Sequence, residues 1–161
     1  MIENIRPWKK ELLKNVNILS NLLKLKRWTE PSRLQLEKSL FISFYIIRKL
    51  IESQKISKHI INIPITIKIY LPKGVKITRL NMYDLEVIYE LHYSEDCEKC
   101  IEFICNEFIH SYIFVDCLEL SRFSIHQLSS VYVTSRKERC NQICCIQINT
   151  IIDIINTVVY S

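Results

Sequence analysis

Three polar side chains at helical spacing are the best candidates for chemistry in this chain. Glu102, Asn106 and His110 follow one another at intervals of four residues, so in a helix they share one face. Most residues between them are apolar, which makes this face a polar stripe. An imidazole changes its charge near neutral pH, so a polar stripe that holds His110 and Asn106 is a place where catalysis could occur. A purely structural role is the alternative, because a histidine near a helix C-terminus interacts favourably with the helix dipole.

The stretch Cys-Asn-Glu-Phe-Ile-His-Ser over residues 105–111 resembles the motif of HEPN domains, which occur in many prokaryotic toxins and antiviral proteins. That motif has an arginine, usually followed by a polar residue such as asparagine, and a histidine after four to six intervening residues. Asn106 and His110 match it, whereas Cys105 stands in the place of the arginine. The resemblance covers residues 8–111 and implies metal-independent RNA cleavage at a dimer interface, with His110 as the acid or base and Asn106 as a positioning group.

The missing arginine leaves two possibilities for a HEPN-like domain, one that only binds and one that cleaves RNA. A guanidinium would stabilise the charge that develops on a phosphate during cleavage, so its loss favours a degenerate domain that binds without catalysis. Arg48, on another expected helix, is a candidate to replace it. An active HEPN-like endoribonuclease therefore stays open as the alternative.

The cysteines form a second constellation. Cys97 and Cys100 make a C-x-x-C pair, and Cys140 and Cys144 lie near an expected hairpin. Four thiolates could hold a structural zinc ion, so these four are weak metal candidates. Against zinc, the C-x-x-C pair is expected on the apolar face of a helix, where cysteine packs as a small hydrophobe. The odd count of 7 cysteines also suits reduced thiols better than a set of disulfides.

Charge is distributed unevenly along the chain. Residues 1–80 hold 17 Lys/Arg and 5 Asp/Glu, whereas residues 81–120 hold 1 basic and 10 acidic residues, within a net charge of +5. This asymmetry predicts a basic face and an acidic face. Either the basic face binds RNA or an acidic protein, or the two faces neutralise each other within the fold or an oligomer.

Two groups of basic residues are the candidate binding residues. The first lies in the N-terminal 60 residues, and the second in an expected hairpin tip that follows Tyr132, where basic and aromatic side chains could contact phosphate and base. A solvated turn is the alternative for the second group. The candidates are Lys9, Lys10, Lys24, Lys26, Arg27, Arg136, Lys137 and Arg139.

Composition excludes several classes of protein. The chain has a single glycine, so it holds neither a P-loop nor a dinucleotide-binding fingerprint, and no cofactor is expected. It has no apolar run of about 18 residues, as a membrane span requires. Its charged N-terminus does not fit a signal peptide, so a cytoplasmic location is expected.

Periodicity predicts an α+β fold in one domain of 161 residues. An antiparallel helical hairpin comes first, in a basic segment over residues 1–60, and a β segment over 61–80 follows, in which 75–79 pairs back on the first strand. Two acidic helices are expected within 81–111, and a β-rich part with a closing helix over 112–161. The expected helices are 8–26, 31–53, 82–92, 94–111 and one from a capping box at Thr150 and Asp153, and the expected strands are 62–71, 112–118, 128–134 and 143–148.

The charge asymmetry and the incomplete motif together predict a small non-catalytic binding or accessory protein with RNA or a protein as its partner. A homodimer, and a place in a prokaryotic defence or toxin–antitoxin module, follow from the HEPN resemblance. The metal-independent ribonuclease and the zinc-stabilised structural protein are the alternatives.

Overall fold

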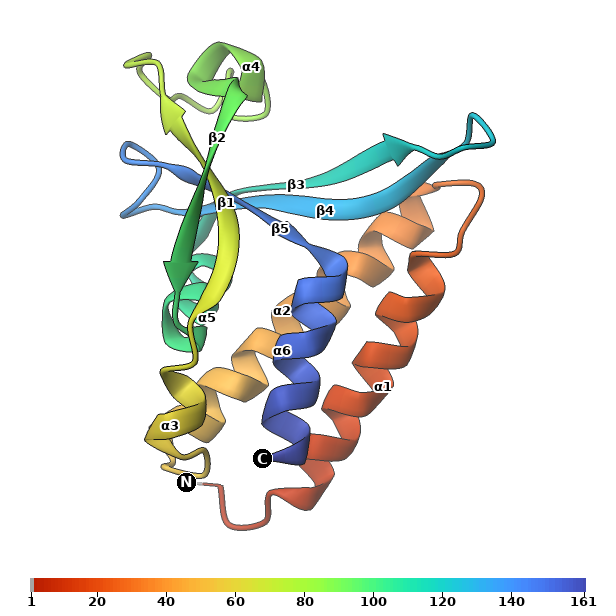
Figure 1. The fold of residues 1–161 in the computed structure, drawn as a ribbon, viewed down its shortest axis with the longest axis vertical. Helices are drawn as coiled ribbons and strands as arrows, with labels where there is room; N and C mark the ends of the chain where they lie inside the picture. Colours follow the sequence, from red (N-terminus) through yellow and green to blue (C-terminus); the bar gives the residue numbers. More distant parts are fainter. Residues whose placement is uncertain (1) are drawn as a thin grey trace.

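Helices and strands are segregated in the computed structural model, which describes residues 2–161 (Figure 1). Within these residues a five-stranded antiparallel sheet and six helices form an α+β fold, as the sequence predicts. The elements are α1 (Arg6–Leu22), α2 (Glu30–Glu52), α3 (Lys58–Ile61), β1 (Ile65–Pro72), α4 (Leu85–Ile88), β2 (Tyr89–Lys99), α5 (Ile101–Ile109), β3 (Ser111–Leu120), β4 (His126–Ser135), β5 (Ile143–Gln147) and α6 (Ile148–Tyr160).

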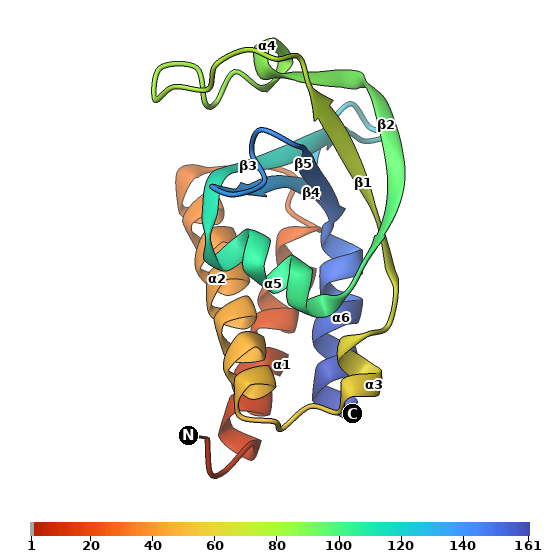
Figure 2. The ribbon, with the colours of Figure 1, turned by 90° about the vertical axis from the view of Figure 1, so that its left-hand side faces the viewer.

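The sheet has the strand order β2-β1-β5-β4-β3, so β2 and β3 are its edges. It twists strongly, and β1 and β2 run across the direction of β3 and β4 (Figures 1 and 2). The long helices α1, α2 and α6 gather on one side of it, where α1 packs against both others and α5 packs against α2. The main core lies between these helices and the sheet.

The connection between α1 and α2 attaches this helical hairpin to the sheet. Thr29 caps α2 by accepting the backbone N–H of Ser32 at 3.4 Å, as expected for a threonine before a helix. Next to it, the Trp28 indole N–H donates to Asp116 Oδ2 on β3 at 2.8 Å, and Arg33 Nε donates to Asp116 Oδ1 at 2.9 Å. The Asp116 carboxylate, whose side chain is only 9 % exposed, thus ties the connection between α1 and α2 to an edge strand.

A second, smaller cluster lies on the opposite face of the sheet. Side chains alternate between the faces of a strand, and on β4 Val131 and Val133 join the main core whereas Tyr132 joins the smaller cluster. Leu85 and Ile88 of α4 complete that cluster. The short α4 therefore covers only part of this face.

The extent of the two helices predicted within residues 81–111 is the main error of the sequence analysis. Only α4 and α5 are helical there, and Tyr89–Lys99 is the edge strand β2, paired antiparallel with β1. β1 buries Ile67 and Ile69 and needs a partner strand, and this pairing outweighs the weak helix propensity of residues such as Tyr, His, Ser and Asp. The acidic side chains of β2 therefore lie on a strand and not in the first turn of a helix.

Two smaller predictions are also wrong. The expected strand over 75–79 does not form, because β2 takes the place beside β1. The closing helix begins at Ile148, before the predicted capping box at Thr150 and Asp153.

Ion pairs connect the basic N-terminal half with the acidic middle of the chain. Arg33 pairs with Asp116, Arg48 with Glu102, and Lys68 with Asp96. Among residues 2–161, however, none of the eight candidate binding residues forms an ion pair with an Asp or Glu side chain. Neutralisation within the fold is therefore partial.

Candidate functional site

The polar stripe lies on α5, as its spacing predicts. Ile101, Ile104 and Phe108 are buried in the main core, which turns Glu102 and Asn106 toward the surface. The helix begins after Cys100 and ends at His110, its C-cap residue. It is a helix of 9 residues between two strands, and the last member of the stripe stands at its end.

A guanidinium from α2 lies on this stripe. Arg48 Nη1 donates to Glu102 Oε1 at 3.1 Å and to Asn106 Oδ1 at 2.9 Å. Its Nε donates to Glu52 Oε1 on its own helix at 2.9 Å. Arg48, considered from the sequence as a replacement for the missing arginine, therefore does contact Asn106, although two carboxylates share it.

Cys105 faces away from the site. Its side chain is fully buried in the main core, and burial raises the pKa of its thiol strongly. The position that matches the motif's arginine thus points into the protein. A guanidinium can reach the stripe only from a neighbouring element, as Arg48 does.

His110 links the stripe to the basic turn between β4 and β5. Its ring is exposed, and within residues 2–161 it has no hydrogen-bond partner. Its backbone N–H donates to the Asn106 carbonyl at 3.0 Å, and its carbonyl accepts the Arg136 N–H at 3.1 Å. Two regions that the sequence presents as separate candidates are therefore adjacent in space.

The basic turn is held in a defined shape. Tyr89 donates its hydroxyl to the Arg139 carbonyl at 2.7 Å, and Thr134 Oγ1 donates to the Gln142 carbonyl at 2.9 Å. The guanidinium groups of Arg136 and Arg139 lie 5.8 Å and 4.8 Å from the centre of the Tyr112 ring. The turn thus presents cations beside an aromatic ring.

Glu107 is the site residue that sequence reasoning missed. Its side chain is buried at 2 % exposure, and its Oε2 accepts the Ser135 N–H at 2.8 Å. Burial raises the pKa of this carboxyl, although the hydrogen bonds from Ser135 oppose the rise. An acidic residue between Cys105 and Phe108, on the apolar face of the helix, was the signal that could have revealed it.

A shallow hollow collects these side chains at the C-terminal end of α5. Its volume is about 240 Å³. Both signs of charge are present, so the hollow is polar and does not form a deep enclosed pocket. The residues that line it are Phe103, Asn106, Glu107, His110, Ser135, Lys137 and Glu138.

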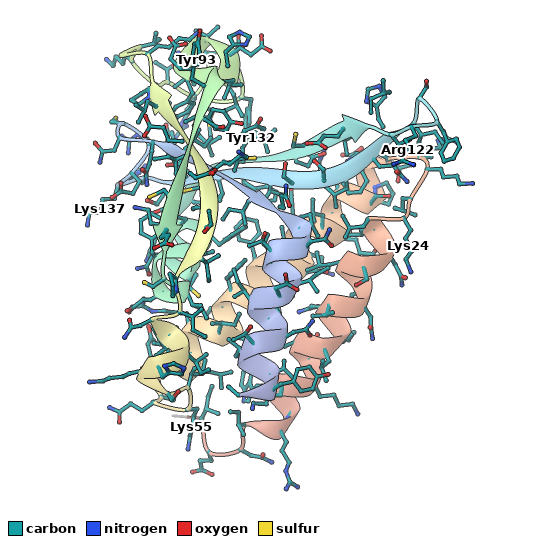
Figure 3. All side chains as sticks on the ribbon, in the orientation of Figure 1. Lys24, Lys55, Tyr93, Arg122, Tyr132 and Lys137 are labelled. Carbon is teal, nitrogen blue, oxygen red and sulfur yellow. The ribbon has the colours of Figure 1, made fainter. Side chains whose placement is uncertain are left out.

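The N-terminal basic candidates do not belong to this surface. Figure 3 shows Lys24 and Lys137 on opposite sides of the molecule. Lys9 and Lys10 lie near the start of α1, roughly 20 Å from Lys24 at 1.5 Å of rise per helical residue, and Lys9 Nζ donates to the Ser161 carbonyl at 3.0 Å. The eight basic candidates thus form at least three separate groups.

The candidate cysteines are dispersed over several elements. The prediction that Cys97 and Cys100 lie on a helix is wrong, because Cys97 lies on β2 and Cys100 precedes α5. Cys140 is exposed in the turn between β4 and β5. Cys144 is buried in the core, where burial raises the pKa of its thiol to about 12. Across residues 2–161, no three side chains of His, Cys, Asp or Glu come together as a metal site requires, so the zinc alternative gains no support.

Comparison with protein-family models, with curated proteins and with solved structures gives no match. In the described part of the chain, no helix combines the length and the apolar composition needed to cross a bilayer. Function is therefore argued from the geometry of this surface.

Proposed function

We propose that this protein binds single-stranded RNA without cleaving it, through a surface that we call the turn–helix surface. It consists of Arg136, Lys137 and Arg139 in the β4–β5 turn, His110 and Asn106 at the end of α5, and Tyr112. The observation that carries the proposal is the hydrogen bond from the Arg136 N–H to the His110 carbonyl, at 3.1 Å, because it joins the basic turn to the polar stripe.

The chemistry of this surface suits a nucleic acid. Cations position the phosphate backbone, and none of the three in the turn forms an ion pair with a carboxylate among residues 2–161. Arginine and tyrosine planes stack on unpaired bases without strict sequence preference. A disordered acidic protein would engage the same cations but would make no use of these stacking planes.

Binding without catalysis is favoured by the state of Arg48. Its guanidinium already donates to Glu52, Glu102 and Asn106, and its side chain is 27 % exposed. A cation engaged by two carboxylates is poorly placed to stabilise a third anion, since the charge it would offer is largely balanced. A non-catalytic accessory protein of a defence or toxin–antitoxin module would have this property.

Replacing Arg136, Lys137 and Arg139 together with alanine is expected to weaken RNA binding by at least about 10-fold at about 50 mM salt, because three phosphate contacts and their counterion release are lost. The slope of log affinity against log salt should fall in magnitude by about 2. The measurement is fluorescence anisotropy of a labelled, mixed-sequence single-stranded RNA over a range of salt concentrations.

The matched control replaces Lys24, Lys26 and Arg27 with alanine, which removes the same charge from the connection between α1 and α2. This variant should bind within about 3-fold of the wild type. Equal losses from both variants would assign binding to net charge and contradict the turn–helix surface. Absence of binding by the wild type at low salt would end the proposal.

A metal-independent ribonuclease is the second candidate, favoured by the contact between Arg48 and Asn106 and by the exposed His110 ring. If it is correct, wild-type protein should cleave RNA in the presence of a chelator, and His110→Ala and Arg48→Ala should each lower the rate by about 100-fold or more. Gel analysis of labelled RNA measures this. Equal rates for wild type and His110→Ala would exclude it, and binding without cleavage would favour the first proposal.

A further inference from the structure

Exposed apolar side chains concentrate at the end of the molecule that carries α4. Among residues 2–161, six of the thirteen exposed large hydrophobic residues lie between residues 71 and 93. Leu80, Tyr93 and Tyr83 are the most open of these, at 99 %, 77 % and 68 % exposure. Figure 3 places Tyr93 at this end, far from Lys55 at the other. A concentration of exposed apolar groups in one place marks an interaction surface more often than scattered single residues do.

The C-terminal part of this segment and the rest of β2 are strongly acidic, whereas the loop before them carries Lys73, Lys76 and Arg79. Residues 80–98 contain six Asp/Glu and no Lys/Arg. Among the described residues only Asp96 of these six forms an ion pair, with Lys68 at 3.3 Å. Lys73 also lies close by, but it donates to the backbone carbonyl of Glu86 and not to the carboxylate. Tyr83, Val87 and Tyr93 therefore lie in an acidic stretch whose carboxylates, apart from Asp96, have no ion-pair partner among the described residues.

The outer edge of β2 can also pair with a further strand through its backbone. β2 is an edge of the sheet and pairs only with β1. Its pairing with β1 is regular over 94–99 and irregular between Tyr89 and Ser94, so six residues offer a straight free edge. An extended segment can add to such an edge through main-chain hydrogen bonds, with specificity coming from its alternate side chains.

We infer that this acidic edge, formed by β2 with α4, docks an extended basic segment of another protein. Side chains alternate between the faces of a strand, so lysine and arginine side chains of that segment would meet Glu98 on one face, its apolar side chains would contact Tyr93 on the other, and its backbone would pair with β2. The carboxylates repel RNA and anionic lipid surfaces, so charge complementarity selects a basic protein. This surface is distinct from the turn–helix surface and would act alongside RNA binding.

The test uses a labelled 12-residue peptide of alternating lysine and valine as the probe. It should bind the full-length protein and shift backbone amide NMR signals of β2, and charge reversal by Glu95→Lys with Glu98→Lys should weaken binding by at least about 10-fold, as expected when close charge pairs are lost. A peptide of the same composition, with all its lysines in one half and all its valines in the other, should bind at least about 10-fold more weakly. Its side chains do not alternate with the two-residue period of a strand.

The matched control is Glu3→Lys with Glu30→Lys, which makes the same change of net charge at exposed positions of the helical end. Equal weakening by both pairs of substitutions would overturn the inference, as would peptide-induced shifts confined to other elements. Salt-sensitive self-association of the wild type that the peptide abolishes would also overturn it, because the occupant would then be a second copy of this chain. RNA binding should be unchanged in Glu95→Lys with Glu98→Lys, which keeps this test separate from that of the turn–helix surface.

Discussion

Phe108→Ala is expected to lower the free energy of unfolding by about 3–5 kcal/mol, the usual cost of removing a buried aromatic ring. Phe108 is fully buried, and its ring stacks on that of Phe44 with centroids 4.1 Å apart and planes 12° apart. Phe41 and Phe114 also lie against it, at 6.1 Å and 6.3 Å. The ring joins α5 to α2 and to β3, so its loss leaves a cavity that no single element can fill by moving.

Urea unfolding followed by circular dichroism measures this effect, and the slope with denaturant should stay that of the wild type. Phe123→Ala is the matched control, because this phenylalanine is 83 % exposed in the turn after β3, and its loss should stay within about 0.5 kcal/mol. A loss below about 1 kcal/mol for Phe108→Ala would mean that α5 is not packed against α2 through this ring.

Much of this architecture follows from hydrophobic periodicity. α1 and α2 carry apolar residues at helical spacing, and β1, β4 and β5 carry alternating or continuous runs of β-formers, so their sequences specify them locally. The polar stripe on α5 was predicted for the same reason. Apolar neighbours at 101, 104 and 108 turn the helix so that Glu102 and Asn106 face outward.

β2 could not be predicted in this way. Its acidic, polar sequence resembles the first turns of a helix, and only the pairing of Ile67 with Cys97 and of Ile69 with Glu95 makes it a strand. Such pairing joins residues about 30 positions apart, which no local pattern encodes. One side of β1 pairs with β5, and its other side is open to a further strand. The nearest available segment takes that place and becomes the edge strand, whatever its helix propensity.

Only some of the site residues could be predicted from the sequence, for a related reason. Arg48 and Asn106 are 58 residues apart, and Glu107 and Ser135 are 28 apart. Each contact is made by one side chain that the sequence places and another that only the fold brings near. The basic turn was identified from its composition, but its position at the end of α5 depends on the hairpin of β3 and β4, whose register brings Ser111 opposite Ser135.

The two functional proposals divide the charge of the protein. The turn–helix surface carries unpaired cations beside Tyr112, whereas the α4–β2 end carries unpaired carboxylates around exposed apolar side chains. A protein built in this way can hold RNA at one place and a basic protein at another without the two ligands competing for the same residues. Their charges are opposite, so contact between them would reinforce a ternary complex.

Glu107→Ala is expected to lower the free energy of unfolding by about 1–3 kcal/mol, because the buried N–H of Ser135 loses its acceptor. The same change should loosen the β4–β5 turn, since Ser135 also accepts the Glu138 N–H through its hydroxyl at 3.1 Å and the Arg139 N–H through its carbonyl at 3.0 Å. Urea unfolding measures the first effect, and RNA affinity should fall together with it. Glu102→Ala, one turn earlier at a side chain that is 47 % exposed, is the control and should cost no more than about 1 kcal/mol.

Glu107→Gln should raise the free energy of unfolding near neutral pH, in contrast to Glu107→Ala. Glutamine keeps an acceptor for the Ser135 N–H but cannot ionise. Burial raises the pKa of Glu107 above its ordinary value of 4.5, whereas the carboxyl of the unfolded chain titrates near that value. As pH rises from about 4.5 through the raised pKa, the unfolded wild type loses its proton first, so wild-type stability falls.

The variant has no such loss, so the stability of Glu107→Gln relative to wild type should increase as pH rises through this window and level off above it. Below pH 4.5 the protonated glutamic acid and the glutamine should give nearly equal stability, because they have the same shape and both accept the Ser135 hydrogen bond. Urea unfolding of both proteins between about pH 4 and pH 8 measures the difference. If the difference instead moved in favour of the wild type as pH rose, the ionised carboxylate would stabilise the fold, and Glu107 would act as a charged anchor for the turn.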